Sequence, residues 1–314
     1  MFALNKELKR TAFYYGCMII SFFAIIMGVS DNAYLSLAAL FALLPLLLFS
    51  KKTGIQRYLI IIATFFSVVQ CIGWINSFFG NGVLGIDSAF NIVVSFRGLK
   101  FGIIALWIII LIWKTIDIKA NKEEKEYGNI YKNLWLLFLA VVLTGIIYMC
   151  YDINVLGKPS RFGSLSSYFV FNDDWGTHRG YIWRNAIEEF LELSIWKKII
   201  GYGPETFGIF LLQKTGNNPY NELFDSAHNE YLHLLITVGI AGLISYLVFV
   251  ISNIWNTFRR AKNNSYAIAI GFGVICYSVQ AFVNLNLPIV TPVFWLLMSM
   301  GAARTFEGTS KARV

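Results

Sequence analysis

The sequence predicts an all-α membrane protein, a polytopic bundle of about eight transmembrane helices with one large extracytoplasmic loop containing amphipathic helices. Three observations support this fold class. Hydrophobic residues make up 57% of the 314 residues and charged residues only 14%, which is too apolar for a soluble globular protein. Apolar runs recur that are long enough to cross a bilayer, and basic residues collect on alternate connections between them.

The apolar runs give the expected spans. The first follows Lys9 and Arg10 but lacks a small-x-small cleavage site, so we expect an uncleaved span rather than a signal peptide. The full set of expected spans is about 12–29, 32–49, 58–79, 95–113, 134–151, 232–255, 265–284 and 287–303.

Basic residues set the expected orientation. They gather in the N-terminal segment, in the connections at 51–57, 114–132 and 259–262, and in the C-terminal tail. The positive-inside rule makes this side cytoplasmic, so both termini are expected in the cytoplasm. The net charge of +8 is then explained by topology and by contact with the lipid bilayer, and we expect no nucleic-acid partner.

We expect one integral membrane unit over 1–314. It comprises N-terminal transmembrane helices 1–5 in 1–151, an extracytoplasmic loop in 152–231, and helices 6–8 with a cytoplasmic tail in 232–314. The cysteines are scattered without CxxC spacing and predict free thiols, and His228 and His233 lack the one-face spacing of a helical metal pair. We therefore expect no metal and no cofactor.

The loop is too long for a simple connection and too rich in apolar residues for a disordered one. Its pattern predicts an amphipathic helix over 181–200, lying flat on the bilayer and capped by Gly201. A second helix is expected to start at Gly203-Pro204. The face expected to be apolar contains Trp183, Ile187, Phe190, Leu191 and Ser194.

His228-Asn229 ends the loop and leads into an apolar run. On a continuous helix, positions 228, 232, 235, 239 and 242 form one stripe, and the glycines at 239 and 242 would let a neighbouring helix approach. A helix N-terminus at His228, capped by Asp225 or Ser226, disfavours the charged imidazolium and favours a general base. A simple interfacial anchor is the alternative. His233, on the opposite face, is expected to have a packing role.

Four motifs follow one another along the chain. They are Ser95-Phe96-Arg97-Gly98, Arg179-Gly180-Tyr181-Ile182-Trp183, Gly201-Tyr202-Gly203-Pro204, and His228-Asn229 followed by Gly239-x-x-Gly242. This order resembles the bacterial O-antigen ligase and Wzy-type polysaccharide polymerase family. The resemblance extends from about Tyr168 to Tyr246 and, with Phe96 inserted into the first motif, from Ser95 to Trp113.

The resemblance implies an inverting, metal-independent glycosyltransferase in the bacterial cytoplasmic (inner) membrane, with its active site outside. The implied donor is an undecaprenyl-diphosphate-linked oligosaccharide and the acceptor is another glycan. A polymerase would build a surface polysaccharide such as capsule, exopolysaccharide or O-antigen, whereas a ligase would move the finished glycan to lipid A core or to protein, and both remain alternatives. The richness in Lys, Asn, Ile and Phe is typical of an AT-rich genome and favours a bacterium without lipid A, and hence a polymerase.

The expected catalytic residues are His228, Arg179 and Arg97, because arginine binds a diphosphate through a planar fork and a neutral histidine accepts a hydroxyl proton. Arg97 has Lys100 nearby, which equally fits an ordinary interfacial charge. Further expected substrate-binding residues are Asn229, Glu230, His178 and Trp183, and the motif glycines and proline, Gly201, Gly203, Pro204, Gly239 and Gly242, are expected to be structural.

Two other classes of membrane protein stay open. Gly201-Tyr202-Gly203 is similar to the end of a potassium filter but lacks the preceding Thr-Val. A secondary transporter would show related halves with helices interrupted near mid-membrane, whereas polar residues here gather at the outer face.

Overall fold

A computed structural model describes residues 1–5, 7–80, 82, 88–119, 125–261 and 264–310. Over these ranges the protein is all-α, with 13 α-helices and two short 3-10 helices, η1 (Pro159–Tyr168) and η2 (Ala281–Val283). The chain forms two compact units, Met1–Leu139 and Ala140–Val314, and the boundary between them falls within α6 (Ile130–Asn154).

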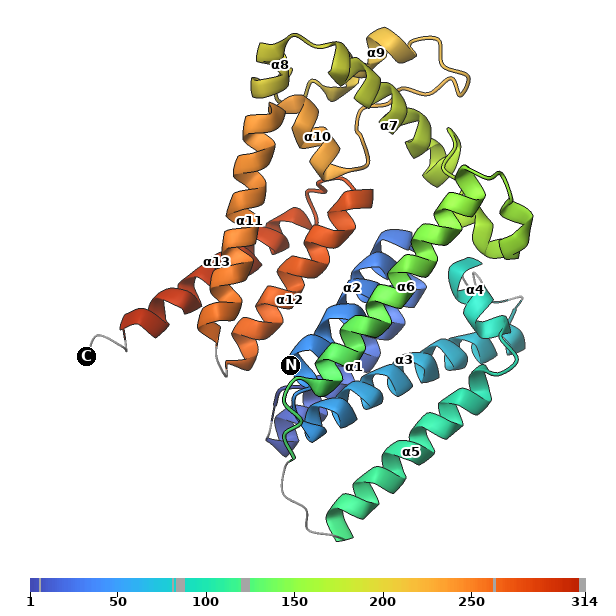
Figure 1. Cartoon of the computed structure of the whole chain (residues 1–314), viewed down its shortest axis with the longest axis vertical. Helices are drawn as coiled ribbons and strands as arrows, with labels where there is room; N and C mark the ends of the chain where they lie inside the picture. Colours follow the sequence, from blue (N-terminus) through green and yellow to red (C-terminus); the bar gives the residue numbers. More distant parts are fainter. Residues whose placement is uncertain (6, 81, 83–87, 120–124, 262–263, 311–314) are drawn as a thin grey trace. The chain divides into compact units, whose positions relative to one another are not determined.

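The first unit is organised around one long helix, α3, which packs against its neighbours α1, α2, α4 and α5 (Figure 1). At the start of α3, Lys52 is buried and its Nζ lies 2.7 Å from Asp117 of α5, which also accepts a hydrogen bond from Gln56. The helices of this unit are α1 (Leu8–Met27), α2 (Asp31–Leu48), α3 (Lys52–Phe78), α4 (Ser88–Ser95) and α5 (Leu99–Lys119).

The second unit combines a three-helix group with a folded loop. The helices α11 (Gly239–Ala261), α12 (Ser265–Gln280) and α13 (Thr291–Ser310) pack pairwise against one another. The loop helices gather at one end of α11 (Figure 1). They are α7 (Trp175–Glu192), α8 (Ile195–Ile200), α9 (Phe207–Thr215) and α10 (Glu230–Thr237).

Six helical segments within the described ranges are long and apolar enough to cross a membrane. The all-α class and the multi-pass character are thereby confirmed. The apolar parts of α2 and α13, Asn32–Leu48 and Thr291–Ala303, are shorter. The six are Leu8–Met27, Lys52–Phe78, Leu99–Lys119, Ile130–Asn154, Gly239–Ala261 and Ser265–Val283.

The expected span 232–255 is wrong as a continuous helix. It is divided between α10 and α11 at Val238 and Gly239, and Gly239 adopts φ +70°, a left-handed conformation that interrupts the helix. The stripe of positions from 228 to 242 therefore does not form. The span expected to begin at 95 also starts later, at Leu99.

The loop has a hydrophobic core of its own, so it is folded as expected. Ile182, Ala186 and Phe190 repeat every fourth residue on one face of α7 and point into this core. The core joins α7, α9 and α10, and its fully or nearly fully buried members are Ile182, Ala186, Phe190, Phe207, Phe210, Leu211, Ala227, Leu232 and Ile236.

The single helix expected over 181–200 is wrong. Leu193 and Ser194 are extended, with ψ of 149° and 154°, and Leu193 packs on the loop core, so the chain breaks between α7 and α8. The expected face is also incorrect, because Ile187 and Leu191 are exposed. The helix expected at Gly203-Pro204 begins only at Phe207, since Gly203 and Glu205 have positive φ.

Candidate functional site

Arg179 is the first residue of the regular part of α7. Before it, Gly176, Thr177 and His178 have successive left-handed φ values of +62°, +60° and +66°. This turn brings the 172–173 backbone against the helix, where the Tyr181 N–H donates to the Asp173 carbonyl at 3.1 Å. A Cβ at Gly180 would collide with the Asn172 carbonyl oxygen, so glycine there permits the contact.

His228 lies immediately before α10 in a segment that α7 holds in place. Trp183 Nε1, one helical turn after Arg179, donates to the Ala227 carbonyl at 2.7 Å. His228 itself has φ +45°, a conformation unusual for a residue with a side chain, and its N–H donates to Ser226 Oγ at 3.3 Å. Backbone strain of the kind that a positive φ creates at a non-glycine residue is common at functional sites.

The helix cap is Asn229, not Asp225 or Ser226 as expected. The Asn229 side chain accepts the Leu232 N–H at 3.0 Å, and Asn229 has the extended backbone typical of an N-cap. His228 therefore sits next to the helix N-terminus, as predicted, but just outside the helix.

Arg179 and His228 act on one another electrostatically. Burial of the His228 imidazole lowers its pKa below the ordinary value of 6.5, the positive charge of Arg179 lowers the pKa further, and Asp225 opposes this shift. Both burial and the charge of Arg179 thus favour the neutral form of the His228 imidazole. Such a pair is able to bind an anionic leaving group and accept a proton.

Asn229 and Glu230 are both buried, each with a relative exposure of 6%, and both side chains accept hydrogen bonds within the protein. Asn229 caps α10. The Glu230 carboxylate accepts hydrogen bonds from Tyr246 of α11 at 2.9 Å and Tyr277 of α12 at 3.3 Å. Burial raises the pKa of Glu230, while the hydrogen bonds from the two tyrosines lower it. Glu230 thereby fixes α10 to the two following helices.

The His178 imidazole contacts other residues of the loop. It stacks on Tyr220 with ring centroids 3.7 Å apart, and its Nδ1 lies 3.1 Å from Glu222. Tyr220 in turn donates to Asp174 at 2.8 Å, and this hydrogen bond, followed by burial, raises the pKa of Tyr220 to about 12. His178 thus braces the left-handed turn that precedes Arg179.

The motif glycines bring two backbone segments together. The N–H groups of Tyr202 and Gly203 donate to the carbonyls of Ile236 and Thr237 at 2.8 and 3.0 Å. A Cβ at Gly239 would collide with the Ile199 carbonyl and the Gly201 nitrogen, and one at Gly201 would collide with the Thr237 carbonyl. The segment that follows α8 is therefore locked to the α10–α11 junction.

Gly242 and Pro204 have more local surroundings. A Cβ at Gly242 would meet the Val238 side chain of the preceding turn rather than a neighbouring helix. Pro204 is exposed and lies between two residues of positive φ, in the turn before α9.

We predict that Gly239→Ala destabilises the protein by about 2 to 6 kcal/mol, because a side chain there adds left-handed backbone strain to a collision with fixed backbone atoms. Gly145→Ala is the matched control, since among the described residues nothing lies within 4 Å of its added Cβ. Thermal unfolding of both variants in detergent checks this. Equal thermal unfolding midpoints for the two variants would show that the close contact between Gly201 and Gly239 is not needed for stability.

Arg97 belongs to the first compact unit, Met1–Leu139. It is exposed in the turn between α4 and α5, where the Phe96 ring packs against Gly98. His228 and Arg179 belong to the second unit. The participation of Arg97 in the same site stays a prediction.

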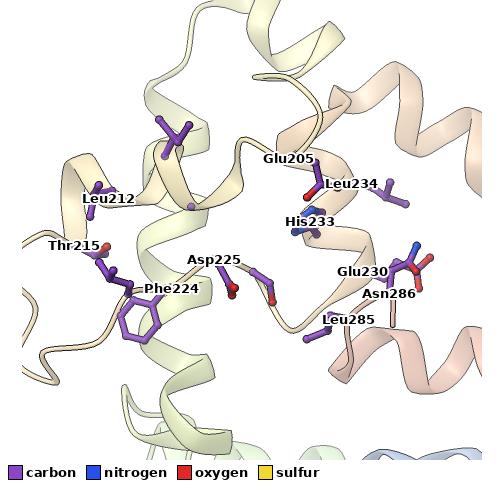
Figure 2. A pocket seen from close by; sticks show the side chains of 14 residues that line it. Glu205, Leu212, Thr215, Phe224, Asp225, Glu230, His233, Leu234, Leu285 and Asn286 are labelled. Atoms are coloured by element: carbon purple, nitrogen blue, oxygen red, sulfur yellow. The ribbon is translucent and has the colours of Figure 1, made fainter. Parts of the chain in front are cut away.

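The second unit also contains a pocket of about 610 Å³ that the sequence did not indicate (Figure 2). His233 lines it and stacks on Phe207, with ring centroids 5.2 Å apart. Burial lowers the pKa of His233, while Glu205 and Asp225 act to raise it. His233 thus packs on Phe207 and also lines the pocket. The pocket could not be predicted because its residues come from Glu205, α9, α10 and the segments at 223–226 and 285–286.

Within the described residues, no group of three or more His, Cys, Asp or Glu side chains is arranged to hold a metal ion. Metal independence nevertheless stays a prediction. Comparison of the chain with known protein families finds no match, and comparison with curated proteins finds no similar sequence. The functional argument therefore depends on the residues and geometry described above.

Proposed function

We propose that the protein is a membrane glycosyltransferase that extends or transfers a polyprenyl-diphosphate-linked glycan. The observation that carries this proposal is geometric: the Trp183–Ala227 hydrogen bond holds the residue before His228 against α7, one helical turn after Arg179. The lowering of the His228 pKa by burial and by the charge of Arg179 is consistent with it. The order of the sequence motifs, which resembles the O-antigen ligase and Wzy-type polymerase family, supports the same chemistry.

In the proposed reaction, an acceptor hydroxyl oxygen attacks the anomeric carbon of the donor sugar from the face opposite the diphosphate. The new C–O bond forms as the bond to the diphosphate oxygen breaks, which inverts the anomeric configuration. The hydroxyl proton passes to the unprotonated ring nitrogen of His228. Arg179 binds the diphosphate as its negative charge grows, and Arg97 is proposed to assist.

The proposed topology puts this site outside a bacterial inner membrane. The helices α2 and α13 are proposed to complete eight spans with the six described above, and both termini are then cytoplasmic. A cysteine introduced at exposed Asn217 should react with an impermeant reagent added from outside. A cysteine at Lys122, outside the described residues, should not, and the reverse pattern would contradict the orientation.

A polymerase is favoured over a ligase only by the composition of the chain, as stated above. A channel is disfavoured because the Gly201-Tyr202-Gly203 backbone is locked against α10 by the hydrogen bonds from Tyr202 and Gly203. A transporter and a glycosyltransferase are expected to act differently on a lipid-linked oligosaccharide when the purified protein is tested.

The test is glycan transfer by the purified protein in liposomes supplied with an undecaprenyl-diphosphate-linked oligosaccharide. We expect longer lipid-linked glycans to form in the presence of a metal chelator. Release of the oligosaccharide across the bilayer without any new glycosidic bond would instead identify a transporter.

A further inference from the structure

We propose that the pocket lined by His233 binds the terminal sugars of the acceptor glycan in the transfer described above, the end that carries the attacking hydroxyl and no phosphate. The inference rests on that proposed function. We call this site the carboxylate pocket, and its polar lining consists of Glu205, Thr215, Asp225, Ser226, Glu230, His233 and Asn286 (Figure 2).

The size and lining of the carboxylate pocket fit a small sugar. Its volume of about 610 Å³ falls within the range of pockets that hold small ligands. Glu205 and Asp225 offer hydrogen-bond acceptors for sugar hydroxyl or amino groups, and the Asn286 amide nitrogen is a donor. Ile209, Leu212 and Phe224 add an apolar wall suited to the C–H faces of a sugar ring.

The charge of the carboxylate pocket separates it from the diphosphate site. Among the described residues that line it there is no lysine or arginine, whereas Glu205 and Asp225 are acidic, as is Glu230, whose carboxylate is bound by Tyr246 and Tyr277. A diphosphate would be repelled by this lining. Arg179, which acts on His228, is not among the lining residues. Donor and acceptor are thus distinguished by opposite local charge.

One short segment connects the carboxylate pocket to the proposed base. Asp225 and Ser226 line the pocket, and Ser226 Oγ accepts the N–H of His228. The Asp225 charge acts on both His228 and His233. Asp225 and Ser226 thus belong both to the lining of the pocket and to the segment that leads to the proposed base.

The test uses the purified full-length protein in nanodiscs and three labelled disaccharides. These are an N-acetylglucosamine disaccharide, its de-acetylated amino form, and a disaccharide containing glucuronic acid. We expect the uncharged and amino forms to bind and the acidic form not to bind. Leu212→Trp fills the pocket and should weaken binding by at least about tenfold. Gln213→Trp, the next exposed residue of α9 and outside the pocket, should bind as the wild type does.

A charge reversal guards against misfolding of the filled variant. Glu205→Lys should weaken binding of the amino disaccharide and allow binding of the acidic one. The proposal is overturned if none of the three disaccharides binds, or if the wild type prefers the acidic form. It is also overturned if Leu212→Trp and Gln213→Trp bind the disaccharides equally well.

The same assay separates this proposal from the proposed function. His228→Asn should bind the disaccharides as the wild type does, because His228 is not among the lining residues. If His228→Asn still elongates glycan, the proposed reaction fails while the carboxylate pocket stands. If transfer depends on His228 but the Leu212→Trp variant binds normally, only the pocket assignment fails.

Discussion

His228→Asn should reduce glycan transfer by about 10² to 10⁴ while leaving the protein folded, because it removes a general base. Asparagine is the appropriate replacement because it tolerates the left-handed conformation that His228 adopts at φ +45°. The loss should therefore come from the missing imidazole and not from the backbone. Transfer in liposomes, at matched amounts of folded protein, measures the effect.

The matched control is His178→Asn. His178 is also a histidine in the left-handed region, with φ +66°, but its ring stacks on Tyr220 and faces Glu222 within the loop. This variant is expected to lower the unfolding temperature somewhat and to retain most of the transfer activity. If His228→Asn transfers at the wild-type rate, His228 is not the base, and if His178→Asn loses as much activity as His228→Asn, His178 does more than brace the loop.

Arg179→Gln should lower the transfer rate by about 10² to 10³, the usual effect of removing one group that stabilises developing negative charge. Arg179→Lys keeps the charge but loses the planar fork, so we expect a reduction of at least about tenfold. Arg184→Lys is the control on the same helix, because Arg184 is exposed and already paired with Asp173 at 2.7 Å. Normal transfer by Arg179→Lys would reduce Arg179 to an interfacial anchor.

The parts of the fold that could be predicted from the sequence depend on local patterns. Apolar runs of about 20 residues mark membrane helices regardless of their neighbours, and six such segments are present. The position of His228 beside a helix N-terminus was also predictable. The breaks at Leu193 and Gly239 were not, because they depend on packing. Gly239 owes its conformation to Gly201, which is distant in sequence.

The opposite-face relation predicted for His228 and His233 failed for the same reason. Opposite faces for His228 and His233 followed from assuming one continuous helix, but His228 lies outside α10. The lining of the carboxylate pocket is assembled from segments as distant as Glu205 and Asn286. No spacing rule along the chain connects residues that tertiary packing alone brings together.

The central claim is that burial and Arg179 keep the His228 imidazole neutral in one shared site. Titration of the labelled His228 ring by NMR, in the full-length protein, tests it most directly. The account predicts a pKa below 6.5, a higher pKa in Arg179→Gln, and a lower one in Asp225→Asn, since Asp225 opposes the shift. The acid limb of transfer activity should move with it, because the rate increases as the imidazole loses its proton. A His228 pKa at or above 6.5, or one that Arg179→Gln leaves unchanged, would contradict the claim.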